Sequence, residues 1–216
     1  MRLVNGWQFP DADTFMANAL RPNGDHAKWL YQIGHLEAAL RYVTEWSCAI
    51  DGGAHVGTWS RVMADRFDQV IACEPSPDTF ACLALNLRDT AVDCRNVALG
   101  DVAGSVEMHI RPEQAERGNT GARFVQAGGS IPMITIDSLD LPSLGLLKLD
   151  IEGSEYMALK GAAETLRRCR PIVLYEDKHL WHRHYGTAKD AVSKLLTGLG
   201  YRHLERVSMD EIWGPA

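Results

Sequence analysis

The sequence has 216 residues, of which 46% are hydrophobic and 23% are charged. At roughly 150 residues per domain, this length predicts one domain, or two at most, with a substantial core. The formal net charge of −6 disfavours binding of nucleic acid through a basic face, and no apolar run reaches the ~18 residues that span a membrane. The five cysteines form no C-x-x-C pair, so a disulfide framework and a zinc site are disfavoured. We expect a cytoplasmic protein without a secretory signal.

The first part of the chain has helical periodicity. Apolar residues recur at helical spacing over residues 13–20 and again over residues 29–43. We therefore expect an N-terminal helical appendage over residues 1–45 and a main domain over residues 46–216.

From residue 47 on, short apolar strands alternate with helices. This alternation predicts a doubly wound α/β fold with a mostly parallel sheet, helices on both faces and an antiparallel strand pair at the C-terminus. Strands are expected over residues 48–51, 70–74, 92–99, 105–110, 131–136, 146–150, 171–176, 201–204 and 207–213. Helices are expected over residues 58–67, 77–87, 154–168 and 187–198.

Residues 111–130 interrupt this alternation. They carry Gly118, Gly121, Gly128 and Gly129 among scattered charges, so we expect a long loop. Loops of this length inside a compact domain are usually functional lids or disordered. We interpret the segment as a mobile lid over a ligand pocket.

Ligands of doubly wound sheets bind at the carboxyl ends of the strands. The polar residues expected there are Asp51, Glu74, Asn96, Asp150 and Glu176. The strongest local signal is the run Asp51-Gly52-Gly53-Ala54-His55-Val56-Gly57, between a strand and a helix. Its glycines let the backbone turn sharply and approach a ligand closely.

Two carboxylates indicate the kind of ligand. Asp51 disfavours a phosphate and favours a cationic or amine-bearing group, while Glu74 can accept two hydrogen bonds from a ribose diol. Together they describe S-adenosylmethionine. The spacing Gly52-x-Ala54-x-x-Gly57 is also a degenerate dinucleotide fingerprint. An NAD-dependent oxidoreductase therefore stays open, as does a non-catalytic nucleotide-binding module.

A longer motif lies downstream, where residues 147–155 read LKLDIEGSE and residues 159–162 read LKGA. Here the sequence resembles the FkbM-type methyltransferases, a family of class I S-adenosylmethionine-dependent enzymes. The resemblance covers roughly residues 47–176. It departs from the family at His55, where asparagine is frequent. Further matching segments are residues 49–57, 74–75, 86–87, 96–100, 135–139 and 171–176.

The resemblance implies a Rossmann-like fold and a role for each matching residue. The loop from Asp51 to Gly57 is expected to hold the methionine moiety, Glu74 the ribose and Asn96 with its neighbours the adenine. Family members mostly methylate hydroxyls, so the implied acceptor is a hydroxyl of a glycan or small metabolite. The complete set of implied cofactor contacts is Asp51, Gly53, Ala54, His55, Gly57, Thr58, Glu74, Pro75, Asn96, Val97 and Asp150.

The acceptor proton needs a destination, because an aliphatic hydroxyl is about as weak an acid as water, pKa ~15.7. The catalytic residues that we predict are His179, Asp150 and Glu152. Histidine titrates near neutrality, so His179 is the predicted base, with Asp150 positioning the hydroxyl and no metal ion required. Lys148 shares a strand face with Asp150 and is expected to neutralise the acids there. Glu176, at the end of the next strand, is a further candidate base.

Overall fold

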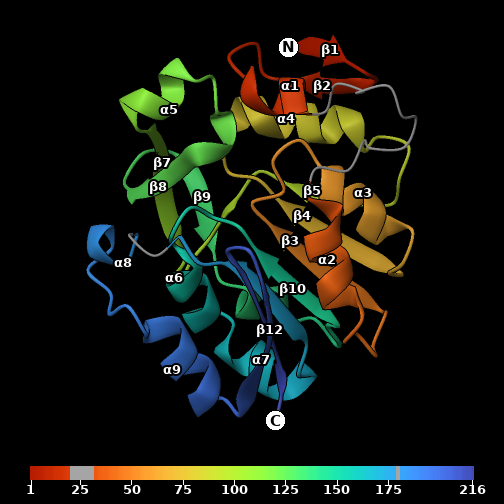
Figure 1. The fold of residues 1–216 in the computed structure, drawn as a ribbon, viewed down its shortest axis with the longest axis vertical. Coiled ribbons are helices and arrows are strands. Elements are labelled where there is room, and N and C mark those ends of the chain that lie inside the picture. The colour runs from red at the N-terminus through yellow and green to blue at the C-terminus, as the bar shows by residue number, and fades with distance from the viewer. Residues whose placement is uncertain (20–31, 179–180) are drawn as a thin grey trace.

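The computed structural model describes residues 1–19, 32–178 and 181–216. Its centre is a seven-stranded sheet with the order β12-β13-β11-β10-β3-β4-β5 (Figure 1). Strands β11, β10, β3, β4 and β5 run parallel to one another, and β13 is antiparallel to both β11 and β12. The predicted doubly wound, mostly parallel sheet with an antiparallel C-terminal strand is confirmed. The bounds are β3 (Cys48–Gly52), β4 (Gln69–Cys73), β5 (Asp93–Arg95), β10 (Leu146–Leu149), β11 (Ile172–Glu176), β12 (Tyr201–Val207) and β13 (Asp210–Pro215).

Helices cover both faces of this sheet, which lies between them in Figure 1. Because both faces are buried, the central strands are nearly continuous apolar runs. In the part of the chain that the structure describes, no helix is long and apolar enough to cross a membrane. One face packs against α2 (Ile33–Leu40), α3 (Thr58–Ala64) and α4 (Pro77–Asn86). The other face packs against α6 (Glu155–Lys160), α7 (Ala163–Cys169) and α9 (Ala191–Gly198).

A second, four-stranded sheet has the order β6-β9-β7-β8. The strands expected over residues 105–110 and 131–136 both form, but they pair with each other instead of joining the central sheet. The strand expected over residues 92–99 is divided, since its first part is β5 and its second part is β6. The strands of the second sheet are β6 (Ala98–Leu99), β7 (Gly104–Ile110), β8 (Arg123–Ala127) and β9 (Ile131–Ile134). Two short helices lie elsewhere in the chain, η2 (Asp137–Leu139) and α8 (Trp181–His184).

The prediction of a long loop over residues 111–130 is wrong. The segment contains α5 (Pro112–Glu116), the 3-10 helix η1 (Thr120–Ala122) and strand β8, which pairs with β7 along its whole length. The pairing with β7 supplies the backbone hydrogen bonds that stabilise β8, and a strand of five residues carries little periodicity of its own. The lid role of this segment stays a prediction.

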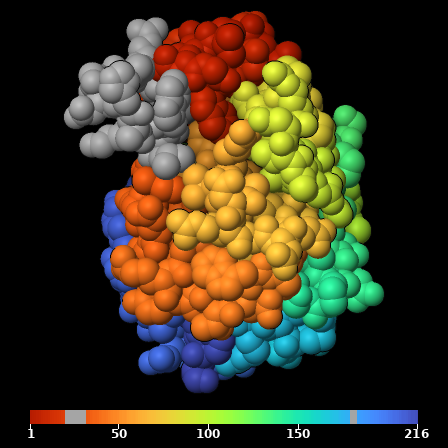
Figure 2. Space-filling view, turned by 90° about the vertical axis from the view of Figure 1, so that its right-hand side faces the viewer, coloured from red at the N-terminus to blue at the C-terminus, as the bar shows by residue number. Residues whose placement is uncertain are grey.

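We expected a purely helical N-terminal segment over residues 1–45, and this prediction is wrong. Strands β1 (Arg2–Val4) and β2 (Trp7–Phe9) form an antiparallel hairpin before α1 (Phe15–Ala19). Its turn is Asn5-Gly6, with φ of 53° and 82°, which is a strong hairpin signal that the helical interpretation overlooked. The hairpin lies beside α4 (Figure 2). The division of the chain at residue 45 stays a prediction.

The helix expected over residues 154–168 is interrupted at Gly161, between α6 and α7. A Cβ atom at Gly161 would lie 2.0 Å from the carbonyl oxygen of Gly100. Only glycine therefore allows the joint between the two helices to approach the loop after β6 this closely. This contact fixes the end of α6, the helix that follows the LKLDIEGSE motif.

Candidate active site

A cavity of about 300 Å³ lies at the carboxyl ends of the central strands. This volume is at the lower end of the range for small-molecule pockets, roughly 300–1,000 Å³. Three of the predicted cofactor contacts, Asp51, Gly57 and Asn96, do not line it. The predicted contacts that do line it are Gly53, Ala54, His55, Thr58, Glu74, Pro75, Val97 and Asp150.

Asp51 lies beneath the glycine-rich loop and is fully buried. Its Oδ1 atom pairs with Nζ of Lys148 at 2.8 Å, and its Oδ2 atom accepts a hydrogen bond of 2.6 Å from the Ser60 hydroxyl. Lys148 also donates to the carbonyl oxygen of Gly53 at 3.0 Å. The sequence predicts that Lys148 neutralises the acids that follow it. Its ion pair is with Asp51, and its charge also lowers the pKa of Asp150. The carboxylate of Asp51 therefore supports the loop from below and does not face the cavity.

The loop itself depends on left-handed backbone conformations. Gly53 has a φ of 73°, and a Cβ atom there would lie 1.9 Å from the carbonyl oxygen of Asp150. His55 has a φ of 51°, a conformation in which glycine and asparagine are favoured. The N–H group of His55 donates to Oε2 of Glu74 at 3.0 Å. The loop approaches the residue after β10 so closely that position 53 has room only for glycine.

Glu74 lies at the end of β4 and is buried at the cavity wall. Its Oε1 atom accepts a hydrogen bond of 2.9 Å from the N–H group of Ser76, so within the described residues each carboxylate oxygen has one backbone partner and keeps a lone pair. Burial raises the pKa of Glu74. Asn96 donates to the carbonyl oxygens of Glu74 and Pro75, at 2.8 and 2.9 Å. Asn96 therefore shapes this turn, and Val97 lines the cavity in its place.

A buried polar network on this side of the cavity was not predicted. Nε2 of His55 lies 2.9 Å from Oγ1 of Thr120 and 3.2 Å from Oδ2 of Asp13, and the Thr120 hydroxyl donates to Asp13. Burial acts to raise the pKa of Asp13, but its interactions with His55, Thr120 and the N–H group of Met16 together lower it. The network joins three distant segments of the chain, so no local sequence pattern predicts it.

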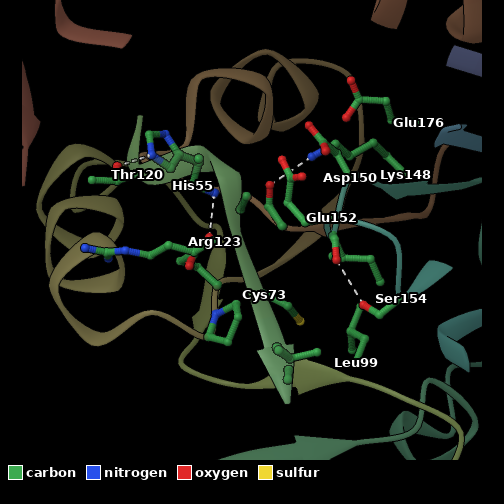
Figure 3. A pocket seen from close by; sticks show the side chains of 18 of the residues that line it. His55, Cys73, Leu99, Thr120, Arg123, Lys148, Asp150, Glu152, Ser154 and Glu176 are labelled. Carbon is green, nitrogen blue, oxygen red and sulfur yellow. Dashed lines mark hydrogen bonds between the residues drawn. The ribbon is translucent and has the colours of Figure 1, made fainter. Parts of the chain in front are cut away.

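The opposite wall of the cavity is acidic. Figure 3 shows Asp150, Glu152 and Glu176 on one side and His55, Thr120 and Arg123 on the other. One carboxylate oxygen from each of the three acids lies within 4.8 Å of the other two. The spacing is close enough for one cation, and the ammonium group of Lys178 occupies that place. Nζ of Lys178 lies 2.8 Å from Glu176 and 3.8 Å from Asp150, and it also contacts Glu152.

The three carboxyl groups differ in acidity. Burial raises the pKa of Glu152 to about 7, although Lys178 acts in the opposite direction. Burial and the neighbouring charge of Asp150 raise the pKa of Glu176 to about 9. Burial also acts on Asp150, but Lys178 and Lys148 outweigh it and lower its pKa. At neutral pH, Glu176 is therefore protonated and Asp150 is ionised.

Sequence reasoning missed Lys178 and places the base at His179. His179 lies outside the residues that the structure describes. Lys178 follows a predicted strand end by two positions, and a cation beside a cluster of acids is the signal that could have identified it. Glu155 was assigned no role, yet it is buried and its carboxylate accepts the N–H groups of Ile151 and Gly153, at 3.1 and 3.2 Å.

Residues 51–203 match the methyltransferase FkbM domain. Over 156 residues the chain is 28% identical to the hexuronic acid methyltransferase AglP of Haloferax volcanii, a match that covers 68% of this chain and 60% of that relative. The chain thus spans about 60% of the length of the curated relative.

Among solved structures, the chain is similar to the methyltransferase FkbM of Methylobacillus flagellatus KT. The TM-score is 0.54 at 21% identity, with coverage of 86% of this chain and 46% of that one. At this identity, the likeness concerns the fold.

Proposed function

The chain belongs to the FkbM family of methyltransferases, and from this we propose that it transfers the methyl group of S-adenosylmethionine to a hydroxyl of a glycan or small metabolite. The observation that carries the proposal is the pairing of Glu74 with a glycine-rich loop on one side of the cavity and the carboxylate of Asp150 on the other. These are the surroundings that a ribose and a cationic methionine moiety need.

The residues of the cavity fit this cofactor. Each oxygen of Glu74 keeps a lone pair for a ribose hydroxyl. The apolar side chains beside it, among them Val97 and Leu99, suit an adenine ring. Asp150, whose side chain is 44% exposed, stays ionised and complements a positive charge. When bound, S-adenosylmethionine supplies an electrophilic methyl group on a sulfonium.

The acidic wall of the cavity, together with Lys178, suits a hydroxyl group as the methyl acceptor. Lys178 can only donate hydrogen bonds, an ionised carboxylate can only accept them, and a protonated Glu176 can do both. A sugar hydroxyl, which donates and accepts, satisfies such a mixed set. The name of the curated relative, a hexuronic acid methyltransferase, supports a sugar as the acceptor.

Calorimetric titration with S-adenosylmethionine and with NAD tests the proposal. We expect S-adenosylmethionine to bind and NAD not to bind. Glu74→Ala is expected to weaken binding by about 1–3 kcal/mol, because it removes the ribose acceptor. Glu164→Ala, a change at an exposed residue of α7, is the matched control. Tighter binding of NAD than of S-adenosylmethionine would instead support the oxidoreductase alternative.

A transfer assay tests the acceptor class. The labelled methyl group of S-adenosylmethionine is offered to methyl glucuronoside, methyl glucoside and their oligomers. Label recovered as a methyl ether supports O-methylation. Label found in a methyl ester or on nitrogen would contradict the proposed acceptor atom.

A further inference from the structure

We propose that Glu152 is the catalytic base of methyl transfer and that Lys178 is the residue that positions it; the assignment rests on the proposed function. The proposal replaces the histidine predicted from the sequence with a carboxylate that lines the cavity.

The geometry of Glu152 is fixed. The residue is 6% exposed and has a φ of 53°, a strained conformation for a side chain of this size. It is followed by Gly153, also with a positive φ, of 96°. Glu155 holds this turn from behind through the N–H groups of Ile151 and Gly153. The turn thereby directs the carboxylate of Glu152 into the cavity, and strain of this kind clusters at functional sites.

The neighbouring carboxyl groups are less suited to accept a proton. Glu176 is already protonated at neutral pH, because its pKa is raised to about 9. Asp150 has a lowered pKa and is therefore a weak base. Glu155, whose pKa burial raises to about 7, does not line the cavity. A base is most effective when its pKa lies near the working pH, and among these groups Glu152 meets that condition inside the cavity.

Lys178 determines where the carboxylate of Glu152 lies. Its ammonium contacts the carboxylates of Glu152 and Glu176, with Asp150 at 3.8 Å, and these acids keep its own pKa raised despite burial. With Glu176 protonated, the cluster holds two negative charges and one positive charge. Uptake of a proton by Glu152 removes the excess negative charge, which is favourable in a buried site.

Two further groups act on Glu152. The positive charge of Arg111 lowers its pKa, and Tyr185 lies close enough for Glu152 to raise the pKa of the phenol. The direct contact of the Glu152 carboxylate is with the ammonium group of Lys178, which is why we assign its positioning to Lys178.

The step balances in atoms and charge. The acceptor oxygen forms its bond to the methyl carbon while the carbon–sulfur bond breaks and leaves its electron pair on sulfur. The acceptor proton passes to the carboxylate of Glu152, which becomes a neutral acid. Loss of that proton to solvent, after the methylated product has left, restores the base.

The test begins with a direct titration that needs no acceptor. Protein labelled with carbon-13 at the glutamate carboxyl is titrated by NMR, and Glu152→Gln identifies the resonance. We expect a midpoint near pH 7, and we expect Lys178→Met to raise it because the attraction of the ammonium is lost. Lys178→Arg is expected to restore it. A midpoint below about pH 5 in the wild type would overturn the assignment.

Turnover and cofactor affinity give the second readout, with methyl glucuronoside as the probe. Glu152→Gln is expected to lower kcat by about 10²-fold or more and to keep the wild-type affinity for S-adenosylmethionine, while Glu164→Gln keeps both. Full turnover in Glu152→Gln would overturn the proposal. Loss of wild-type activity with EDTA, restored by Mg²⁺, would also overturn it, since the acids would then hold a metal ion.

These readouts separate the two proposals. Failure of S-adenosylmethionine to bind the wild-type protein contradicts the proposed function. Normal binding, together with an acidic titration of Glu152, contradicts only the assignment of the base.

Discussion

The buried ion pair between Asp51 and Lys148 allows a quantitative prediction about the support of the glycine-rich loop. The side chains are 0% and 7% exposed, and the two charges are 2.8 Å apart. Lys148→Met keeps the length of the side chain. Among the described residues it leaves the buried carboxylate of Asp51 with the Ser60 hydroxyl as its remaining side-chain partner. Removal of one member of a buried pair typically destabilises a protein by about 3–5 kcal/mol.

Chemical and thermal unfolding measure this change. In a protein of this size, 1 kcal/mol shifts the Tm by roughly 2–4 °C, so Lys148→Met is expected to lower it by about 6–20 °C. Lys160→Met is the matched control, because Lys160 forms an exposed pair with Asp101 and such pairs contribute about 0–1 kcal/mol.

The pH dependence of stability is a second readout of the same pair. Burial acts to lower the pKa of Lys148, but Asp51 and Asp150 outweigh it and raise the value above 10.5. The stabilisation is therefore complete below the ordinary lysine pKa and is lost as the pH rises through the folded value. A loss of less than about 1 kcal/mol in Lys148→Met at neutral pH, equal to that of the control, would refute the reasoning.

Three further predictions concern the region around the cavity. Thr120→Val removes the hydroxyl that donates to buried Asp13 and is expected to lower the free energy of unfolding by about 1–3 kcal/mol, with Thr120→Ser as the conservative control. Burial acts to raise the pKa of Asp78, but Arg123, together with hydrogen bonds from Ser76 and Thr79, lowers it to about 2. The stability that this adds is present above about pH 4 and declines as the pH falls through about 2, and Arg123→Met is expected to weaken that dependence in acid unfolding. If residues 111–130 act as a lid, cofactor and acceptor together are expected to slow their proteolysis, and equal rates with and without ligands would contradict the lid.

The sequence determined the architecture and the location of the site. Alternating apolar strands and helices predict a doubly wound sheet, and the parallel strands of such a sheet end at one edge. The residues predicted at those ends, among them Glu74, Asp150 and Glu176, do line one cavity. These features follow from periodicity over a few residues, which is a local property of the chain.

The tertiary structure decided which side chains pair with one another. Asp51 faces Lys148 beneath the loop, and Lys178 lies among acids that come from the ends of two different strands. The same applies to the pairing of β7 with β8, which gives residues 123–127 their structure. Hydrophobic periodicity reports which face of an element is buried, but it contains no information about the partner of a polar group. That partner depends on contacts between distant segments, which exist only once the chain has folded.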